Sequence, residues 1–374
     1  MLCEAASALG IATVVLAAAP DDAATEAAGD VVVGEATDPV ALAALAARCD
    51  VVTFDHELVD LAALATLEAR GVRVRPTTGA LFAAVDKAAQ RRSFSRAGLP
   101  VPAFVVLDGD ADADLAALGD LAARLGEVPV VKAARGGYDG RGVLVATTMD
   151  DAIAAVARWR SDGVAVVAEA PVAFDAELAA LLARREGGDA VAWRTVETDQ
   201  VGGVCREVRV PGAVRDDTAD AAAAIARRVA EHLGAVGVLA VELFDTAEGL
   251  FVNEVALRPH NSGHWTIEGA TTSQFENHLR AVLDLPLGAT TLVAPAICSV
   301  NVFGAEGGTA PGALAAALAE PTARVHLYGK APRPGRKLGH VTVFGTDADD
   351  VAARAWRAAG ALGTPVPAGL GARR

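Results

Sequence analysis

Aromatic side chains are scarce in this sequence. Phe, Trp and Tyr together make up 4% of the 374 residues, although hydrophobic residues as a class make up 52%. Much of that hydrophobic share is alanine, so large rings cannot fill the core. We expect an aliphatic core in which Ala-rich helices pack on Val-rich strands. A chain of this length is expected to form two or three domains.

Cysteines and long apolar runs are also few. Cys3, Cys49, Cys205 and Cys298 lie far apart, and no CxxC or Cys/His metal spacing exists, which excludes the common zinc motifs. We interpret the four as buried or semi-buried free thiols. No basic segment opens the chain, Glu4 interrupts its first apolar stretch, and no apolar run reaches the roughly 18–20 residues of a membrane span. These absences predict a soluble, cytoplasmic protein without a membrane partner.

Positive charge is not gathered into any long run, and the formal net charge is −14 at pH 7. A general nucleic-acid binder needs a basic surface, so we expect no nucleic acid as a partner. A small phosphorylated ligand is compatible with this charge, because it needs only a local cationic pocket.

The first part of the chain alternates Val-rich runs with Ala-rich stretches. Four runs each resemble a buried parallel strand: IATVVLAAA, DVVVGEATD, DVVTFDHE and GVRVRPT. The stretches PVALAALAARC and LVDLAALATLEARG between them have a helical pattern. Strand and helix in alternation indicate βαβ units. The sequence therefore predicts a doubly wound α/β domain over residues 1–80.

The pattern changes near position 86. DKAAQRRSFSRAG predicts a helix, LPVPAFVVL predicts a strand, and residues 100–168 resemble a small α/β unit. From about residue 164 the strands lengthen and alternate, with hairpin-like breaks at REGGDA and VGGV, which is typical of antiparallel sheet. We expect a second domain over residues 81–290 and a small C-terminal α/β domain over residues 291–374.

A glycine-rich loop is the first candidate for chemistry. Residues 136–142 read GGYDGRG, which matches neither a Walker A loop nor GxGxxG. The segment is either a plain hairpin turn or a loop whose backbone N–H groups approach an anion. Lys132, five residues before Gly137 on a buried-looking strand, favours the second interpretation, because a buried ammonium without a partner is costly.

Two carboxylates are the second candidate. Glu242 and Glu254 lie in apolar runs on either side of a DTAEG turn. In a hairpin centred near residue 248 they would be cross-strand partners whose side chains begin about 5 Å apart. A hard cation such as Mg²⁺ would then relieve their repulsion. A register shifted by one residue would instead place them on opposite faces.

Three further segments carry polar groups that suit a site. Residues 258–265 directly follow the strand of Glu254 and contain two His, an Arg and an Asn, which favours acid–base chemistry. Residues 326–337 form the densest cationic patch, either a solvated loop or a phosphate clamp. Residues 169–172, with Glu177 further on, form a possible hinge strand that would offer its backbone to a base and a carboxylate to a ribose.

These segments occur in an order that resembles one known family. Four stretches closely resemble the 5-(carboxyamino)imidazole ribonucleotide synthases of the ATP-grasp superfamily: PVVKAARGGYDGRG, AEAPVAFDAEL, GVLAVELF…LFVNEVALRPHNSGHWTIEGATTSQFENHLRAVLDLPLG and HLYGKAPRPGRKLGHVTV. The resemblance spans about residues 2–345. Its RPHNSGHWT block is specific, because other ATP-grasp ligases share the nucleotide site but not this block.

The resemblance implies an α/β ATP-grasp fold with an N-terminal doubly wound (pre-ATP-grasp) domain, a lid subdomain at about residues 100–168 and a small C-terminal domain. It also implies the substrates ATP, bicarbonate and 5-aminoimidazole ribonucleotide. Their reaction would pass through carboxyphosphate to the N-carboxylated ribonucleotide, ADP and phosphate, in purine biosynthesis. Mg²⁺ and a homodimer belong to the same expectation. The alternatives are another ATP-grasp carboxylate–amine ligase and an ATP-binding protein without catalysis.

The resemblance also assigns roles to individual residues. Lys132 would hold the phosphates, residues 169–172 would line the adenine pocket, and Glu177 would take the ribose. The full expected ATP site is Lys87, Lys132, Gly137, Tyr138, Asp139, Gly140, Arg141, Gly142, Glu169, Ala170, Pro171, Val172, Glu177, Gln200, Asn253 and Glu254. The expected metal ligands are Glu242 and Glu254. The expected catalytic residues are Arg258, His260, Tyr138 and Arg141, the last two near bicarbonate. The expected ribonucleotide contacts are Asn261, Lys330, Arg336 and Lys337.

Three positions depart from the family pattern. Family members usually begin with a strand and a glycine-rich turn before a helix that resembles MLCEAASALG, and this chain begins inside that helix. We therefore expect the first strand and turn, one wall of the ribonucleotide pocket, to be missing. Gln200 stands where many members have His, and Leu257 stands where Pro is common.

Overall fold

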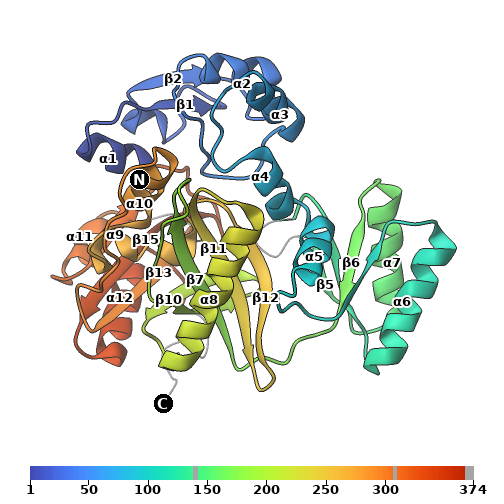
Figure 1. The fold of residues 1–374 in the computed structure, drawn as a ribbon. Coiled ribbons are helices and arrows are strands. Elements are labelled where there is room, and N and C mark those ends of the chain that lie inside the picture. Colours follow the sequence, from blue (N-terminus) through green and yellow to red (C-terminus); the bar gives the residue numbers. More distant parts are fainter. Residues whose placement is uncertain (138–141, 306–309, 367–374) are drawn as a thin grey trace.

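The computed structural model describes residues 1–137, 142–305 and 310–366. Its N-terminal segment contains a two-stranded parallel sheet of β1 (Val14–Ala17) and β2 (Asp30–Val33). The same segment contains α1 (Leu2–Ala8), η1 (Thr25–Ala27), α2 (Pro39–Ala46), α3 (Leu61–Ala69) and α4 (Thr78–Val85). Of these, α2 lies beside the sheet (Figure 1). The side chains of Asp38, Asp60 and Thr77 accept hydrogen bonds from the first turns of α2, α3 and α4, so each helix begins at a side-chain cap.

Only two of the four predicted N-terminal strands form. The runs at residues 50–57 and 71–77 contribute one isolated parallel bridge, between Val52 and Val74. Beyond the bridge the backbone makes local bonds instead of a ladder: Leu58 N–H donates to Nδ1 of His56 at 3.2 Å, and Val59 N–H donates to the Glu57 carbonyl at 3.0 Å. The expectation of two further strands was therefore wrong, although the predicted α/β class is confirmed.

A four-stranded antiparallel sheet follows. Its order is β3 (Phe104–Leu107), β6 (Val166–Glu169), β4 (Val130–Ala133) and β5 (Val143–Val145). The helices α6 (Ala111–Leu125) and α7 (Met149–Ser161) pack on one face, and α5 (Lys87–Arg96) lies on the other (Figure 1). Lys132 of β4 pairs with Val143 of β5, so the glycine-rich segment joins these two strands as predicted.

A larger antiparallel sheet forms the centre of the molecule. Its path is β12-β11-β7-β9-β10-β13-β15-β14, and β8 pairs with β7. The strands are β7 (Ala176–Arg184), β8 (Ala190–Ala192), β9 (Val196–Val201), β10 (Val204–Val210), β11 (Gly237–Thr246), β12 (Gly249–Ala256), β13 (Ala296–Phe303), β14 (Arg324–Leu327) and β15 (Lys337–Gly345). The predicted antiparallel sheet after residue 164 and its hairpins at REGGDA and VGGV are confirmed.

Helices cover both faces of this sheet. α8 (Asp216–Leu233) packs on one face of β7 and β11 (Figure 1). The remaining helical segments are η2 (Asn261–Gly263), α9 (Thr266–Gly269), α10 (Gln274–Val282), α11 (Ala313–Leu318) and α12 (Ala348–Ala361). Because β10 pairs with β13, the sheet continues into the C-terminal segment. The proposed domain boundaries at residues 80 and 290 stay predictions.

A buried carboxylate ties α12 to the central sheet. Glu207 of β10 is fully buried, and its Oε2 accepts a hydrogen bond from Nε1 of Trp356 at 2.9 Å. Its Oε1 accepts from Nε of Arg209 at 2.5 Å and from Sγ of Cys298 at 3.3 Å. Both oxygens are satisfied, so this carboxylate can be buried without an unpaired charge.

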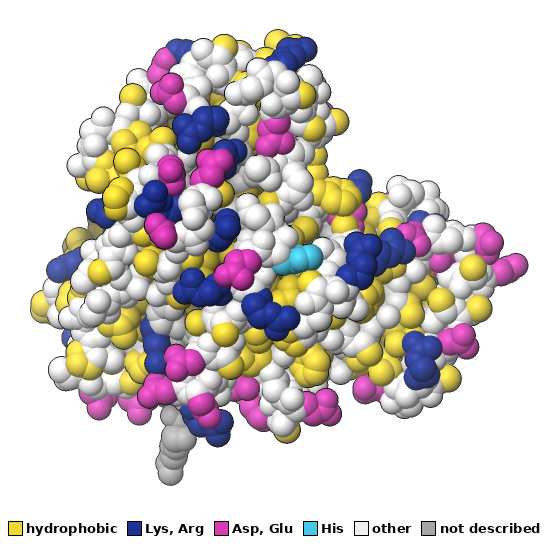
Figure 2. Space-filling view, in the orientation of Figure 1, with side chains coloured by type: hydrophobic (Ala, Val, Ile, Leu, Met, Phe, Trp, Pro, Cys, Tyr) yellow, Lys and Arg dark blue, Asp and Glu magenta, His cyan; other side chains and the backbone are white. Residues whose placement is uncertain are grey.

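The four cysteines agree with the sequence expectation. All four cysteines are free; Cys205 and Cys298 are buried, and Cys3 and Cys49 are partly buried. Figure 2 shows Lys and Arg side chains interspersed with Asp and Glu over one face of the molecule. No helix in the described ranges combines the length and the apolar character needed to cross a bilayer.

A buried histidine joins the N-terminal segment to the central sheet. Nδ1 of His278 accepts a hydrogen bond from Val238 N–H at 3.0 Å, so its proton is on Nε2, which lies 2.7 Å from Oγ1 of Thr53. Gly237 precedes Val238 with φ +112°. A Cβ at Gly237 would lie 2.9 Å from Cε1 of His278. Only glycine therefore lets the strand approach this ring so closely.

We expect Gly237→Ala to destabilise the protein by about 2–3 kcal/mol, because the new Cβ meets His278 and the positive φ becomes strained. Urea unfolding followed by circular dichroism would measure the change. Gly119→Ala is the matched control: Gly119 lies within α6 with nothing within 4 Å of an added Cβ, and this variant should gain about 0.5–1 kcal/mol. Similar effects of both substitutions would contradict the prediction.

His278 also predicts a pH dependence. Burial lowers its pKa to about 3, whereas in the unfolded chain the value is near 6.5. The stabilisation from neutral His278 is thus complete above about pH 6.5 and is lost as the pH falls toward 3, by about 1.4 kcal/mol per unit. His278→Gln cannot titrate, so its unfolding midpoint should fall less than that of the wild type between about pH 7.5 and 5.5. An equal fall in both proteins would refute this assignment.

Candidate functional site

Glu242 and Glu254 are direct cross-strand partners on β11 and β12, as predicted. The route to this pairing differs from the expected one. The turn pairs Thr246 with Gly249, a register that alone would place Glu242 opposite Asn253. A β-bulge shifts the register by one residue between Leu243 and Glu242, and this shift brings Glu254 opposite Glu242.

The bulge also directs two neighbouring side chains toward two lysines. Oδ1 of Asn253 accepts a hydrogen bond from Nζ of Lys132 at 3.3 Å, and Oε1 of Glu254 lies 2.6 Å from Nζ of Lys87. In a regular strand adjacent side chains point to opposite faces. The bulge therefore places Asn253 and Glu254 together beside two lysines from other parts of the chain.

A buried ion cluster connects this hairpin to the small sheet. Glu169, at the end of β6 and 3% exposed, binds Nε of Arg91 at 2.9 Å and the ammonium of Lys132. Burial alone would raise the pKa of Glu169, but Arg91 and Lys132 lower it to about 2. Burial lowers the pKa of Lys132, and Glu169 opposes that change. The anion that Lys132 needs is therefore supplied by the protein itself.

Arg91 is a residue that the sequence analysis missed. Its second guanidinium nitrogen donates to the Asn253 carbonyl at 2.7 Å, so Arg91 joins α5 to the bulge as well as to Glu169. At the start of the same helix, Oδ1 of Asp86 accepts from Ala89 N–H and Oδ2 binds Nε of Arg135 at 2.6 Å. Arg91 and Gln90 are both buried within a helix rich in polar residues, but in sequence they resemble an exposed charged face.

The glycine-rich loop begins and ends at positions that need glycine. Gly136 and Gly142 have φ of +77° and +75°, and a Cβ on Gly142 would lie 3.3 Å from Cα of Gly137. The two ends of the loop thus lie close together. The predicted residues between them, Tyr138, Asp139, Gly140 and Arg141, lie outside the described residues.

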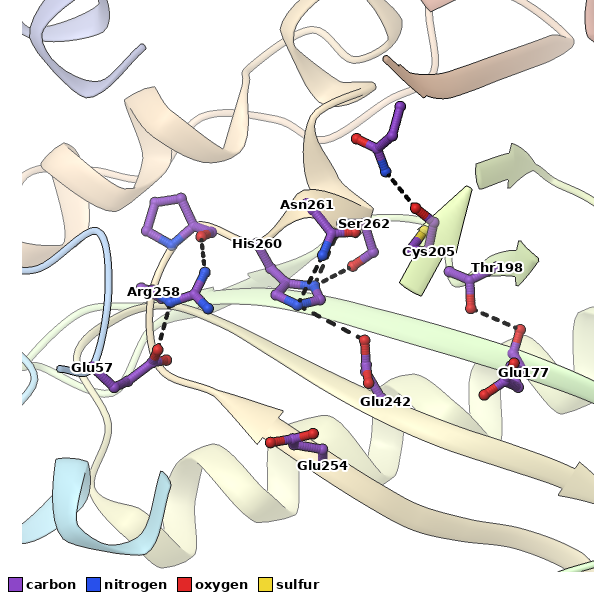
Figure 3. A network of polar contacts seen from close by, with 12 residues as sticks. Glu57, Glu177, Thr198, Cys205, Glu242, Glu254, Arg258, His260, Asn261 and Ser262 are labelled. Carbon is purple, nitrogen blue, oxygen red and sulfur yellow. Dashed lines mark hydrogen bonds and ion pairs between the residues drawn. The ribbon is translucent and has the colours of Figure 1, made fainter. Parts of the chain in front are cut away.

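The turn after β12 places Arg258 and His260 beside the paired carboxylates (Figure 3). Nε2 of His260 lies 3.8 Å from Oε1 of Glu242, and its Nδ1 lies 2.8 Å from Oγ of Ser262. The side-chain amide of Gln274 holds the backbone N–H and carbonyl of His260 at 2.9 and 2.7 Å. Burial, together with the charge of Arg258, holds the pKa of His260 well below its usual value, so the ring is neutral near pH 7.

Arg258 is held by Glu57, a second residue that the sequence analysis missed. Nε of Arg258 donates to Oε2 of Glu57 at 2.7 Å. The other oxygen of Glu57 is buried and has no hydrogen-bond partner among the described residues. Oδ1 of Asn261 is also buried without a hydrogen-bond partner among the described residues, whereas Nδ2 of Asn261 lies 3.4 Å from Nε2 of His260. A ligand with hydrogen-bond donors would satisfy these two acceptors.

One face of the central sheet carries the predicted acidic residues. Glu242 is opposite Ala179 of β7, so Glu177, two residues away, shares its face; Glu177 is opposite Thr198, which places Gln200 on that face too. Burial and the carboxylate of Glu254 raise the pKa of Glu242 to about 8, and burial, with Asp199 nearby, raises that of Glu177 to about 7. α8 covers the opposite face.

The paired carboxylates fit a hard divalent cation. Carboxylate oxygens are preferred Mg²⁺ ligands, and Mg²⁺ is commonly held by one or two carboxylates together with substrate phosphates. No group of three His, Cys, Asp or Glu side chains gathers into a metal site within the described ranges. Glu242 and Glu254 would therefore need a phosphorylated ligand to complete the coordination. Burial, and after it the carboxylate of Glu254, raises the pKa of Glu242, so a bound cation would favour the charged form of Glu242.

The residues of the expected adenine hinge connect the two sheets. Ala170 N–H donates to the Ala103 carbonyl at 2.8 Å, and Ala170, Pro171 and Val172 are partly buried between β6 and β7. Glu169 differs from this expectation in one respect, because its carboxylate is already bound by Arg91 and Lys132.

The predicted cationic patch divides into two parts. Lys337 opens β15, and its charge contributes, after burial, to the lowered pKa values of His260 and His264. Lys330 lies further out, with Nζ 5.5 Å from the centre of the Tyr328 ring, and Arg336 donates to the Ala331 carbonyl at 3.0 Å. The structure therefore places Lys337 near the carboxylates and leaves Lys330 and Arg336 on the adjoining loop.

Three protein-family models match the chain. The model for the ribonucleotide synthetase preATP-grasp domain matches residues 1–85, and the model for the ATP-grasp domain matches residues 92–275. The model for the phosphoribosylaminoimidazole carboxylase C-terminal domain matches residues 298–354. The predicted ATP-grasp fold, with a preATP-grasp part and a C-terminal part, is confirmed by these matches.

Known relatives agree with the family models. The N5-carboxyaminoimidazole ribonucleotide synthase of Mycobacterium tuberculosis is 47% identical over 364 residues, which cover 95% of this chain and 83% of the relative. The crystal structure of the Thermus thermophilus synthetase of that name is 36% identical with a TM-score of 0.86, covering 98% of this chain and 96% of its own. The Aspergillus clavatus synthase, in complex with ADP and 5-aminoimidazole ribonucleotide, is 31% identical with a TM-score of 0.85, covering 97% and 95%.

A substitution at Glu242 tests the cation site. Glu242→Gln removes one of two facing carboxylates, so the protein without ligands should be unchanged or up to about 1 kcal/mol more stable. The rise in thermal unfolding midpoint on adding Mg²⁺ with ATP should be lost in this variant. Glu248→Gln, at the exposed turn of the same hairpin, should keep the rise. A full Mg²⁺-dependent rise in Glu242→Gln would refute the ligand assignment.

Proposed function

The chain belongs to the N5-carboxyaminoimidazole ribonucleotide synthase family of ATP-grasp ligases, and we propose that it uses ATP to join bicarbonate to 5-aminoimidazole ribonucleotide. The products are the N-carboxylated ribonucleotide, ADP and phosphate, formed in the biosynthesis of purines. One observation carries the proposal: His260, from the segment specific to this family, lies 3.8 Å from Glu242 of the paired carboxylates. A group able to act on the ribonucleotide thus adjoins a group able to act on the nucleotide.

The nucleotide binds between the two sheets in this proposal. Residues 169–172 line the adenine, Glu177 takes the ribose, and Lys87 and Lys132 approach the phosphates. Lys87 and Lys132 already lie beside Glu254 and Asn253, so a phosphate entering here meets two ammonium groups at once. The remaining proposed ATP contacts are Gly137, Tyr138, Asp139, Gly140, Arg141, Gly142 and Gln200.

Mg²⁺ completes this half of the site, held by Glu242 and Glu254. The metal would neutralise charge on the transferred phosphoryl group when it is bound. Glu242 favours its uncharged form without a cation, because of burial and the carboxylate of Glu254. Binding of a divalent cation would therefore stabilise the charged form of Glu242.

The reaction takes place in two balanced steps. A bicarbonate oxygen attacks the terminal phosphorus of ATP, the bond to ADP breaks, and carboxyphosphate forms. The exocyclic amine of the ribonucleotide then attacks the carboxyl carbon, and phosphate leaves. The amine must lose a proton, and we assign this proton to the imidazole of His260, which lies 3.8 Å from the carboxylate of Glu242. Arg258, aligned by Glu57, faces the anionic intermediate.

The ribonucleotide is held by Asn261, Lys330, Arg336 and Lys337, with Tyr138 and Arg141 near bicarbonate. Within this set, Lys337 is the residue whose charge acts on both Glu242 and His260, because, after the larger effect of burial, it lowers the pKa of each. A homodimer and a cytoplasmic location complete the proposal. Both rest on the likeness to the family, and sedimentation velocity would test the oligomeric state.

A coupled assay for ADP tests the activity. ADP release by the purified chain should require bicarbonate and 5-aminoimidazole ribonucleotide together, and Glu254→Gln should lose nearly all turnover while keeping its circular dichroism spectrum. Equal release with an unrelated amine would support a ligase with a different acceptor. ATP binding without turnover under any condition would support a non-catalytic nucleotide-binding protein.

A further inference from the structure

Three histidines and a tyrosine form a cluster where β14 and β15 meet the turn that carries His260. The rings of His264 and His340 stack with centres 4.7 Å apart, and those of His340 and His326 stack at 4.6 Å. Nε2 of His326 binds Oε1 of Glu268 at 2.6 Å. The mechanism described above uses none of these side chains.

Tyr328 connects two of the imidazoles. Its hydroxyl oxygen lies 3.2 Å from Nδ1 of His264 and 2.8 Å from Nδ1 of His340. Burial raises the pKa of Tyr328, and burial holds the pKa values of His264 and His340 well below their usual range, so the hydroxyl stays protonated and both rings stay neutral. A hydroxyl has one proton to donate. One ring must therefore donate from Nδ1 to the tyrosine oxygen, while the other accepts the tyrosine proton.

The surroundings of His340 decide which ring donates to the Tyr328 hydroxyl and which accepts from it. His340 is fully buried, and its Nε2 has no hydrogen-bond partner in the described part of the chain. A buried N–H group without an acceptor is rarer and costlier than a lone pair without a donor. The proton of His340 therefore belongs on Nδ1, facing Tyr328. Tyr328 in turn donates to Nδ1 of His264, which leaves the proton of His264 on Nε2.

The Nε2–H group of His264 is the open end of this chain of hydrogen bonds. No protein atom among the described residues pairs with it. Burial is the main cause of the lowered pKa of His264, and the positive charges of Lys337 and Arg258 lower it further, so both cations lie near the ring. A neutral N–H donor among cations suits an anionic oxygen, since it adds a directed hydrogen bond without a further charge.

We propose that Tyr328 is a positioning residue that selects the tautomer of His264, so that its Nε2–H donates to a phosphate-type oxygen of the bound reactants. That oxygen belongs to the ribonucleotide phosphate or to carboxyphosphate. The inference rests on the proposed function for its substrates, but the direction of the hydrogen bonds depends only on the four side chains.

Amide substitutions give a crossed test of this direction. Glutamine places its N–H group near the position of Nε2, and asparagine places its own near Nδ1. The relevant KM is that for ribonucleotide or bicarbonate, whichever substrate supplies the oxygen. In His264→Gln this KM should stay within about threefold of the wild-type value, and in His264→Asn and Tyr328→Phe it should rise by about tenfold or more. His340 should show the reverse preference, tolerating Asn better than Gln. A KM change for ribonucleotide or for bicarbonate identifies the source of the oxygen.

The controls separate positioning from stability. The KM for ATP and the thermal unfolding midpoint should change little in the crossed set, and exposed His232→Gln in α8 should match the wild type. Equal KM values for His264→Gln and His264→Asn would overturn the proposal. A parallel rise in the KM for ATP with a falling unfolding midpoint in every variant would also overturn it, in favour of a structural cluster.

Nitrogen-15 NMR of the ligand-free protein reads the tautomers directly. We expect His264 protonated on Nε2 and His340 protonated on Nδ1, with this pattern lost for His264 in Tyr328→Phe. The opposite assignment would overturn the inference. This measurement needs no turnover, so it remains decisive if the wild type shows no ADP release with bicarbonate and 5-aminoimidazole ribonucleotide, a result that would refute the proposed function instead.

Discussion

The carboxylate of Glu169 is the point on which the rest of the site depends. It binds Arg91 from α5 and Lys132 from β4, and Arg91 continues to the carbonyl of Asn253 in β12. Removing one member of such a buried ion cluster leaves the others without compensation. The junction between the small sheet and the central hairpin is therefore built from mutually required charges, and the apolar cluster between α5 and the small sheet is limited to a few side chains.

Two glutamates in this region have opposite electrostatic states. Cations hold the pKa of Glu169 at about 2, whereas burial and Glu254 raise that of Glu242 to about 8. Residue type alone does not separate these roles, because environment sets the charge of a carboxyl group. Glu169 is compensated by the fold, and Glu242 is left to be compensated by whatever binds. One site thus contains a carboxylate with a structural role, Glu169, and a carboxyl group whose charge responds to a bound cation, Glu242.

Local pattern predicted much of this structure. The α/β class and the antiparallel hairpins follow from periodicity and turn residues. The facing of Glu242 and Glu254 was predicted correctly, but it depends on a shift of register within the hairpin. The β-bulge at Asn253 could not be predicted, because no local motif marks it and only the tertiary contacts of Arg91 and Lys132 define it. The two missing N-terminal strands reflect the same limit: their apolar runs look like strands, but local hydrogen bonds replace the ladder.

Contacts between distant segments could not be predicted from the sequence either, because only the folded chain brings the two partners together. Glu57 aligns Arg258 across 201 positions of chain, and nothing near Glu57 indicates such a partner. The resemblance to a family located Arg258 and His260, whereas only the folded chain located the groups that hold them. Motifs therefore indicate candidate ligand contacts, whereas the groups that orient these candidates are found only from contacts in the folded chain.

The pairing of β10 with β13 has a consequence for the shape of the polypeptide as a whole. Because β13, β15 and β14 complete the central sheet, its open borders are β12 at one end and β14 at the other. A chain cut between β12 and β13 would leave the backbone groups of β10 (Val204–Val210) facing water as a bare edge, a surface prone to pair with other chains. The strands within residues 296–345 therefore cover an edge of the central sheet that would otherwise be open to pairing with other chains.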